Sequence, residues 1–267
     1  MPLFCRCCAG LSRRHLLALA GASATAGLSG CAAYNELAAS TVSPEQEAKL
    51  GAQAFQQIKG ETPQLRSPQA QARVQRIASR IVPASGSSIP FSEWEVVVFD
   101  SDEVNAFALP GGHIGVYRGI LDIAKSDDEI ATVMGHEVGH VTARHAAQRI
   151  GTSQFAELGT ALFGAGAQAY GLPTQMIGLL GAGVQYGLIL PYTRNQELEA
   201  DSLGLRYMAQ AAYNPEAAVT FWQAMQANAG ADGAPAFLST HPSGEQRIAQ
   251  IEAMLPEVMP LYQQAAS

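Results

Sequence analysis

Residues 126–150 read SDDEIATVMGHEVGHVTARHAAQRI, and most of what the sequence implies can be built outward from this stretch. Ser126 followed three residues later by Glu129 forms a capping box, a signature of a helix N-terminus. Acids fill the first turn, where the helix dipole favours negative charge. The pattern predicts one helix that begins near Ile130 and runs to about Ile150.

The middle of this helix carries the string His136-Glu137-Val138-Gly139-His140. Two histidines four residues apart lie on one helix face, so both imidazoles can reach the same metal ion. Glu137 points about a quarter turn away, which places a carboxylate beside the metal without making it a ligand. This arrangement suits a general base for a metal-activated water, and it predicts a catalytic site with one Zn²⁺ per chain.

A third ligand has to come from elsewhere in the chain. The elongated metzincin pattern is excluded, because Ala143 and Ala146 occupy the positions where it needs glycine and histidine. His145 lies about 140° around a continuous helix from His140, so we expect it to be a solvated histidine outside the site.

The acids of Glu197-Leu198-Glu199-Ala200-Asp201 supply the missing ligand. On a helix Glu197 and Asp201 share a face, while Glu199 points elsewhere. Glu197 is the expected third metal ligand, and Asp201 is expected to support one of the histidines by a hydrogen bond. Two histidines and one glutamate leave a fourth position for water, which is typical of catalytic zinc. A purely structural zinc site would leave Glu137 without a role.

The other elements predict an α+β fold, mostly helical with a small sheet. Helices are expected from Pro44 to about Lys59 and from Pro68 onward. Extended runs at 94–99, 105–109 and 113–117 predict the strands. Residues 158–193 contain no charged side chain and eight glycines. This segment is expected either to form buried core helices or to contact a membrane or gate a cleft.

The N-terminus has the layout of an export signal. Three arginines and no acid precede an apolar run rich in Ala and Gly, and Leu28-Ser29-Gly30-Cys31 resembles a bacterial lipobox. We therefore expect a signal peptide at 1–30, a lipidated tether at 31–42 with the acyl chains on Cys31, and a peptidase domain at 43–267. The pair Arg13-Arg14 resembles a twin-arginine start, and the general and twin-arginine export routes both stay open.

The charge and cysteine content bear on the expected partners and on the presence of disulfides. The 267 residues include 16 Lys and Arg against 23 Asp and Glu, a formal net charge of -7. With no basic stripe, no nucleic-acid partner is expected. Three of the four cysteines lie in the first eight residues, so the exported chain has no disulfide to rely on.

Taken together, the two metal-binding strings resemble those of the gluzincin peptidases related to CAAX prenyl proteases and HtpX. Further strings match the same family: Asn105 to Gly112, Pro191 to Arg194, Ser239 to Pro242, and Arg247-Ile248. The chain is most similar to the lipid-anchored periplasmic branch that acts in outer-membrane protein quality control. It lacks clear spanning helices, unlike the integral-membrane members.

The resemblance implies further roles. His241 of the His-Pro motif would lie near the metal, where it either stabilises the oxyanion or closes the site as a fourth ligand. The run Asn105, Ala106, Phe107 and Ala108 would form the strand on which substrate backbone lies.

Two functions follow from the resemblance. The first is a zinc endopeptidase of the bacterial envelope, anchored by lipid at the periplasmic face of the outer membrane, whose substrates are misfolded or stalled envelope proteins. The second is a chaperone-like assembly factor for outer-membrane proteins, working with the outer-membrane assembly machinery and keeping a latent zinc site blocked by His241.

Overall fold

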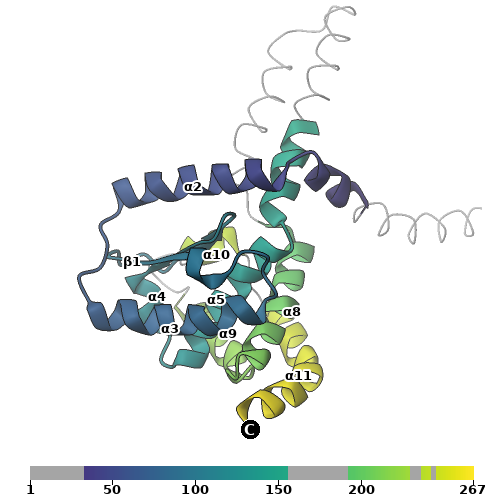
Figure 1. Cartoon of the computed structure of the whole chain (residues 1–267). Helices are drawn as coiled ribbons and strands as arrows, with labels where there is room; N and C mark the ends of the chain where they lie inside the picture. The colour runs from purple at the N-terminus through teal and green to yellow at the C-terminus, as the bar shows by residue number, and fades with distance from the viewer. Residues whose placement is uncertain (1–32, 156–191, 229–235, 242–244) are drawn as a thin grey trace, which may run out of the picture.

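The computed structural model describes residues 33–155, 192–228, 236–241 and 245–267 (Figure 1). The elements, in chain order, are α2 (Pro44–Glu61), α3 (Pro68–Ala84), the 3-10 turn η1 (Phe91–Glu93), β1 (Glu95–Phe99), β2 (Ala106–Leu109), β3 (His113–Tyr117), α4 (Arg118–Ile123), α5 (Asp127–Thr142), α8 (Arg194–Gln210), α9 (Ala217–Ala227), α10 (Ala236–Thr240) and α11 (Glu245–Ala266). The α+β prediction is confirmed. The leader, Cys31 and most of the uncharged segment 158–193 lie outside the described residues.

Helix starts follow the local sequence signals. Ser43 forms a complete capping box with Gln46 at the start of α2, and the Ser67 side chain caps α3. At α5 the Ser126 hydroxyl accepts from the Glu129 N–H, as expected, but the Glu129 carboxylate accepts from the N–H of Lys125 instead of closing the box. The predicted N-terminus of α5 is therefore correct, with one half of the capping box rearranged.

The sheet has three strands in the order β1-β3-β2. β1 pairs with β3 in parallel, and β2 pairs with β3 antiparallel, so β2 is an edge strand. Phe107 lies opposite Gly115, whose missing side chain makes room for the ring, since a Cβ there would be 2.2 Å from it. Ala106 and Ala108 alternate with Phe107 and face the opposite side of the sheet.

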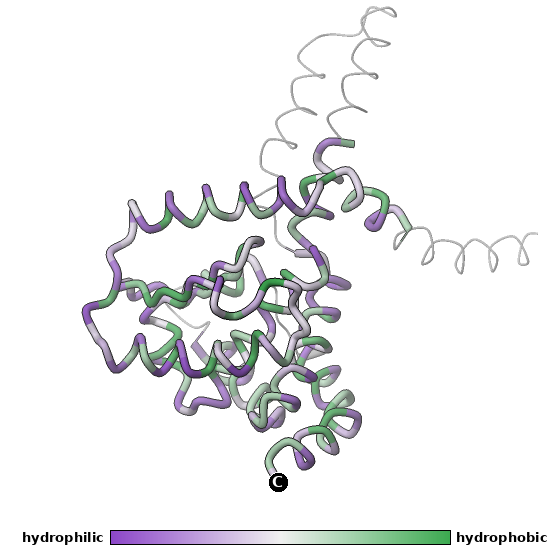
Figure 2. Tube along the Cα trace, in the orientation of Figure 1, coloured by the Kyte–Doolittle hydropathy of each residue, from purple (hydrophilic) through white to green (hydrophobic). Residues whose placement is uncertain are grey.

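Helices cover both faces of this sheet (Figure 1). On one face Phe55 of α2 packs with Phe99, Phe107 and Tyr117 in a small aromatic cluster. On the other face α3, α5, α8 and α9 enclose the main core. Polar and apolar residues alternate along α2 in Figure 2, as expected of a helix with one buried side. Among the described helices, none combines the length and apolar character needed to cross a bilayer.

Two segments differ in local structure from what the sequence suggested. The stretch expected to be a tether is helical at residues 33–40, and its Ala38 is fully buried. Val42, just after it, packs with Ala147. The expected single helix from 130 to 150 is instead interrupted after Thr142, because Arg144 adopts a left-handed conformation with φ 55°. A second helical stretch begins at residue 145.

Small residues bring α5 and α8 into close contact. A Cβ on Gly139 would lie 2.9 Å from the carbonyl oxygen of Ala200, and one on Gly135 would lie 2.9 Å from that of Gly204. Each glycine immediately precedes a histidine of the metal-binding string. The close approach therefore places both histidines of α5 against the acids of α8.

This contact predicts a specific stability effect. Gly139→Ala should lower the free energy of unfolding by about 1–3 kcal/mol, because the new methyl group meets rigid backbone on α8. Gly60→Ala is the matched control, since a Cβ at that helical position has no neighbour within 4 Å. It should leave stability unchanged or raise it by about 0.5–1 kcal/mol. Denaturant unfolding of both variants measures the difference, and equal stabilities would contradict the packing argument.

Candidate metal centre and active site

Four buried side chains converge at one point between α5, α8 and the end of α10. One donor atom from each of His136, His140, Glu197 and His241 lies within 4.8 Å of all the others. The i, i+4 spacing on α5 aligns the two histidines, and α8 presents Glu197 to them across the glycine contact. His241 follows α10 directly, and its N–H donates to the carbonyl of Phe237.

The spacing of these donors fits a tetrahedral metal ion. The Nε2 atoms of His136 and His140 are 3.1 Å apart, and Glu197 Oε1 is 3.3 Å from His140 Nε2. His241 Nδ1 lies 3.1 Å from both His136 Nε2 and Glu197 Oε1. Ligands about 2.0–2.1 Å from a tetrahedral zinc ion would be about 3.3 Å from one another. The residues present therefore fit a metal ion of this kind.

Glu137 lies beside the cluster without belonging to it. Its Oε2 accepts a hydrogen bond of 3.3 Å from the N–H of Ala108, on the edge strand β2. Its Oε1 has no hydrogen-bond partner among the described residues, and His241 Nε2 is 3.4 Å away. Burial raises the pKa of this carboxyl group, although His241 and His136 oppose the shift. A buried carboxylate with one free oxygen is suited to accept a proton.

Asp201 contacts His136, as predicted for a supporting acid. Its Oδ1 is 2.8 Å from His136 Nδ1, which leaves Nε2 of that ring directed at the cluster. Arg247 on α11 donates two hydrogen bonds to the same carboxylate, from its Nε to Oδ2 at 2.6 Å and from its Nη2 to Oδ1 at 2.7 Å. Its Nη1 also lies 2.8 Å from Glu197 Oε2, and the guanidinium lies over the ring of Trp222.

The buried charges shift two of the pKa values strongly. Burial by itself would lower the pKa of His136, but the carboxylates of Glu197 and Asp201 outweigh it and raise that pKa to about 9. Burial would raise the pKa of Glu197, but His136, with the hydrogen bonds from the histidines, holds it far below its usual range. In the absence of a metal ion, His136 and Glu197 therefore form a buried ion pair.

His145 is not the solvated histidine that the sequence predicted. It is fully buried, with its Nδ1 2.7 Å from His140 Nδ1 and its Nε2 3.2 Å from Glu199 Oε2. The turn at Arg144 changes the helical phase, so the 140° offset expected for a continuous helix does not apply. Burial lowers the pKa of His145, although Glu199 opposes the shift.

Two further residues at the site were given no role by the sequence. The ring of Tyr192 stacks on His140 with centroids 3.8 Å apart, and Arg149 donates to its hydroxyl at 3.0 Å. Burial raises the pKa of Tyr192 to about 12. Arg247 had one available signal, because it shares a helix face with the apolar Ile251, where a charge requires a buried partner.

The predicted substrate strand lies next to Glu137. Ala106 and Ala108 of β2 are buried on the site side of the sheet, and the Ala108 N–H points at Glu137 rather than at β3. Phe107 faces α2 instead. Asn105 precedes the strand, where its side-chain amide donates to Glu103 and its oxygen accepts from the N–H of Ala106.

Comparison with known proteins agrees with this geometry. The model of peptidase family M48 matches residues 68–255, which include every residue of the cluster. The chain belongs to this family. The family prediction is confirmed at that level, whereas the narrower resemblance to HtpX and the CAAX prenyl proteases stays a prediction.

Individual M48 relatives fall into two groups. The mitochondrial metalloendopeptidase OMA1 of Schizosaccharomyces pombe is 41% identical over 185 residues, covering 69% of this chain and 52% of the relative. OMA1 of Arabidopsis thaliana is 39% identical over 185 residues, covering 68% of this chain and 36% of the relative. The beta-barrel assembly-enhancing protease of Escherichia coli K12 is 28% identical over 238 residues, covering 86% of this chain and 48% of the relative. The chain thus spans about half or less of the length of these relatives.

Proposed function

We propose that this chain is a zinc-dependent endopeptidase. The observation that carries the proposal is the convergence of His136, His140, Glu197 and His241 within 4.8 Å, beside a buried Glu137. Membership of a peptidase family supports it. A nitrogen- and oxygen-donor set at tetrahedral spacing favours zinc over the larger, oxygen-preferring cations.

In this proposal His136, His140 and Glu197 hold one Zn²⁺, which when bound supplies a Lewis acid that polarises the scissile carbonyl and acidifies water. Glu137 takes a proton from the attacking water at its free Oε1 and then delivers it to the leaving amine. Asp201 fixes the ring of His136, and Arg247 neutralises the buried acids. Substrate backbone lies along the edge strand β2 at Ala106 and Ala108, with Asn105 at its start.

Metal removal tests the proposal. The full-length protein should cleave casein, lose that activity when a chelator strips the metal, and regain it with one equivalent of Zn²⁺. Activity that survives complete metal removal would contradict a metallopeptidase.

The raised pKa of His136 predicts how zinc affinity depends on pH. At neutral pH the metal-free protein carries a proton on His136 that zinc has to displace. The apparent affinity should therefore rise about tenfold for each pH unit between 7 and 9 and level off above 9, where the proton is already lost. Chelator competition across this range measures the slope, and a flat profile would contradict the predicted protonation.

We further propose that the enzyme acts in the bacterial envelope, anchored by lipid on Cys31 at the outer membrane, on misfolded or stalled envelope proteins. The lipobox-like string and the likeness to the Escherichia coli protease support this location. Cys31→Ala should move the protein from the membrane to the soluble periplasmic fraction. If the variant stays membrane-bound on fractionation, the anchor lies elsewhere in the chain.

One observation favours a second candidate function. His241 is itself within the metal cluster, where it would occupy the fourth ligand position of the zinc ion and block catalysis. In this second candidate function the protein is a chaperone-like factor that holds outer-membrane proteins and contacts their assembly machinery. His241→Ala separates the two functions. Faster casein cleavage would support a latent site blocked by His241, and slower cleavage would support a His241 that stabilises the oxyanion.

A further inference from the structure

We propose that His145 and Glu199 are positioning residues that hold His140 in the tautomer required for metal binding. This inference rests on the proposed metal site and assigns a role to two residues outside the ligand set. The observation is an unbroken chain of contacts from His140 Nδ1 to His145 Nδ1 at 2.7 Å, and from His145 Nε2 to Glu199 Oε2 at 3.2 Å.

Hydrogen-bond chemistry fixes the direction of this chain. The Glu199 carboxylate only accepts, so His145 must donate from Nε2, and its Nδ1 is then an acceptor. His140 therefore carries its proton on Nδ1 and donates it to His145. The Nε2 of His140 is left with its lone pair toward the metal cluster, which is the form that binds a metal ion.

The same arrangement exists for the other histidine of the string. His136 Nδ1 contacts Asp201 directly, whereas His140 reaches its acid through one intervening imidazole. In both ligand histidines the Nδ1 atom, which faces away from the metal cluster, is therefore held by a carboxylate, directly for His136 and through His145 for His140. The two supporting acids, Asp201 and Glu199, lie two residues apart on α8 and so point in different directions.

The backbone is shaped to place His145 there. Arg144 holds the left-handed turn that ends α5, and non-glycine residues rarely adopt this conformation. Its guanidinium donates to the buried Glu47 at 3.0 Å and to the carbonyl of Val42 at 2.7 Å. These contacts tie the turn to the N-terminal part of the fold, so His145 folds back over His140.

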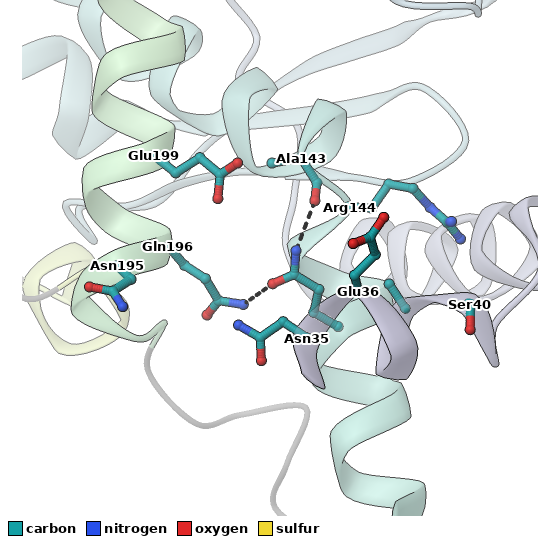
Figure 3. Close-up of a pocket in the computed structure, with 10 residues that line it drawn as sticks. Asn35, Glu36, Ser40, Ala143, Arg144, Asn195, Gln196 and Glu199 are labelled. Atoms are coloured by element: carbon teal, nitrogen blue, oxygen red, sulfur yellow. Dashed lines mark hydrogen bonds between the residues drawn. The ribbon is translucent and has the colours of Figure 1, made fainter. Parts of the chain in front are cut away.

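Glu199 remains a solvated carboxylate at the outer end of the chain. Its side chain is 56% exposed and lines a cavity of about 570 Å³ between α8, the end of α5 and the helix at 33–40 (Figure 3). Figure 3 shows Glu199 directed toward Ala143, across the cavity from Glu36 and Ser40.

The test is the zinc dissociation constant of the full-length protein, measured by chelator competition. His145→Leu removes the acceptor and should weaken zinc binding by about 10–100-fold. His145→Asn, whose side-chain oxygen can replace the Nδ1 acceptor, should recover most of that loss. Glu199→Ala should show a smaller loss in the same direction. His113→Leu is the control, because His113 stacks on Phe55 away from the metal cluster and its replacement should leave zinc affinity unchanged.

The visible spectrum of the cobalt-substituted proteins gives a second readout, since a reoriented His140 changes the ligand field while a general loss of stability does not. Parental zinc affinity in His145→Leu would overturn the inference, as would an Asn variant no better than the Leu variant. If the parent protein itself binds no zinc, the proposed function fails together with this inference.

Discussion

Glu137→Gln should reduce casein cleavage by about 10²–10⁴-fold while leaving the zinc content of the protein unchanged. The substitution keeps the size of the side chain and an oxygen that can accept from the Ala108 N–H, but it removes the group that takes the proton from water. Glu137 is not among the four clustered donors, so its loss should not release the metal. The measurement is casein hydrolysis beside metal analysis of the same two preparations.

A matched comparison separates this effect from simple damage to the site. Glu197→Gln weakens a proposed ligand, so it should lose both zinc and activity, whereas Glu137→Gln should lose activity alone. Activity close to that of the parent in the Glu137 variant would show that another group accepts the proton.

Arg247→Met should lower the free energy of unfolding of the metal-free protein by about 3–5 kcal/mol. The guanidinium is buried and contacts both Asp201 and Glu197, so its removal leaves two acids in the core without the arginine cation that pairs with both of them. Methionine is similar in length and keeps much of the packing on Trp222. Denaturant unfolding after chelator treatment measures the loss, and bound zinc should reduce it, because the metal ion would neutralise Glu197.

Arg76→Met provides the control for this prediction. Arg76 also pairs with an acid, Asp127, but its side chain is 59% exposed. Exposed ion pairs contribute little, so this variant should unfold almost as the parent does. An Arg247 variant as stable as the Arg76 variant would contradict the interpretation of a buried charge network.

The features predicted correctly from the sequence are those encoded by local spacing. The caps at Ser43, Ser67 and Ser126 act within one helical turn, and each marks a helix start in the structure. The first strand was predicted from a run of β-branched and aromatic residues, and the other two from extended runs on either side of Pro110-Gly111-Gly112. The convergence of the α5 histidines with Glu197 could also be anticipated, because i, i+4 spacing aligns donors whatever the rest of the fold is.

The features that were missed depend on contacts between distant segments. The position of His145 follows from a backbone turn that Arg144 adopts while held by Glu47 and Val42, about a hundred residues earlier in the chain. The helix at 33–40 packs through Ala39 against Ala147, more than a hundred residues later in the chain, so its local sequence alone did not predict it. Arg247 and Tyr192 join the site through tertiary packing. Of the two, Arg247 alone had a signal in the sequence, its place on one helix face with the apolar Ile251.

Zinc analysis combined with X-ray absorption at the zinc edge tests the central claim most directly. For the full-length protein we predict one zinc ion per chain, bound only by nitrogen and oxygen at about 2.0–2.1 Å, with imidazole scattering from the histidines. The same protein carrying His140→Ala should lose most of its zinc. A folded parent without zinc, or a zinc ion bound through sulfur, would contradict a metal centre built from His136, His140 and Glu197.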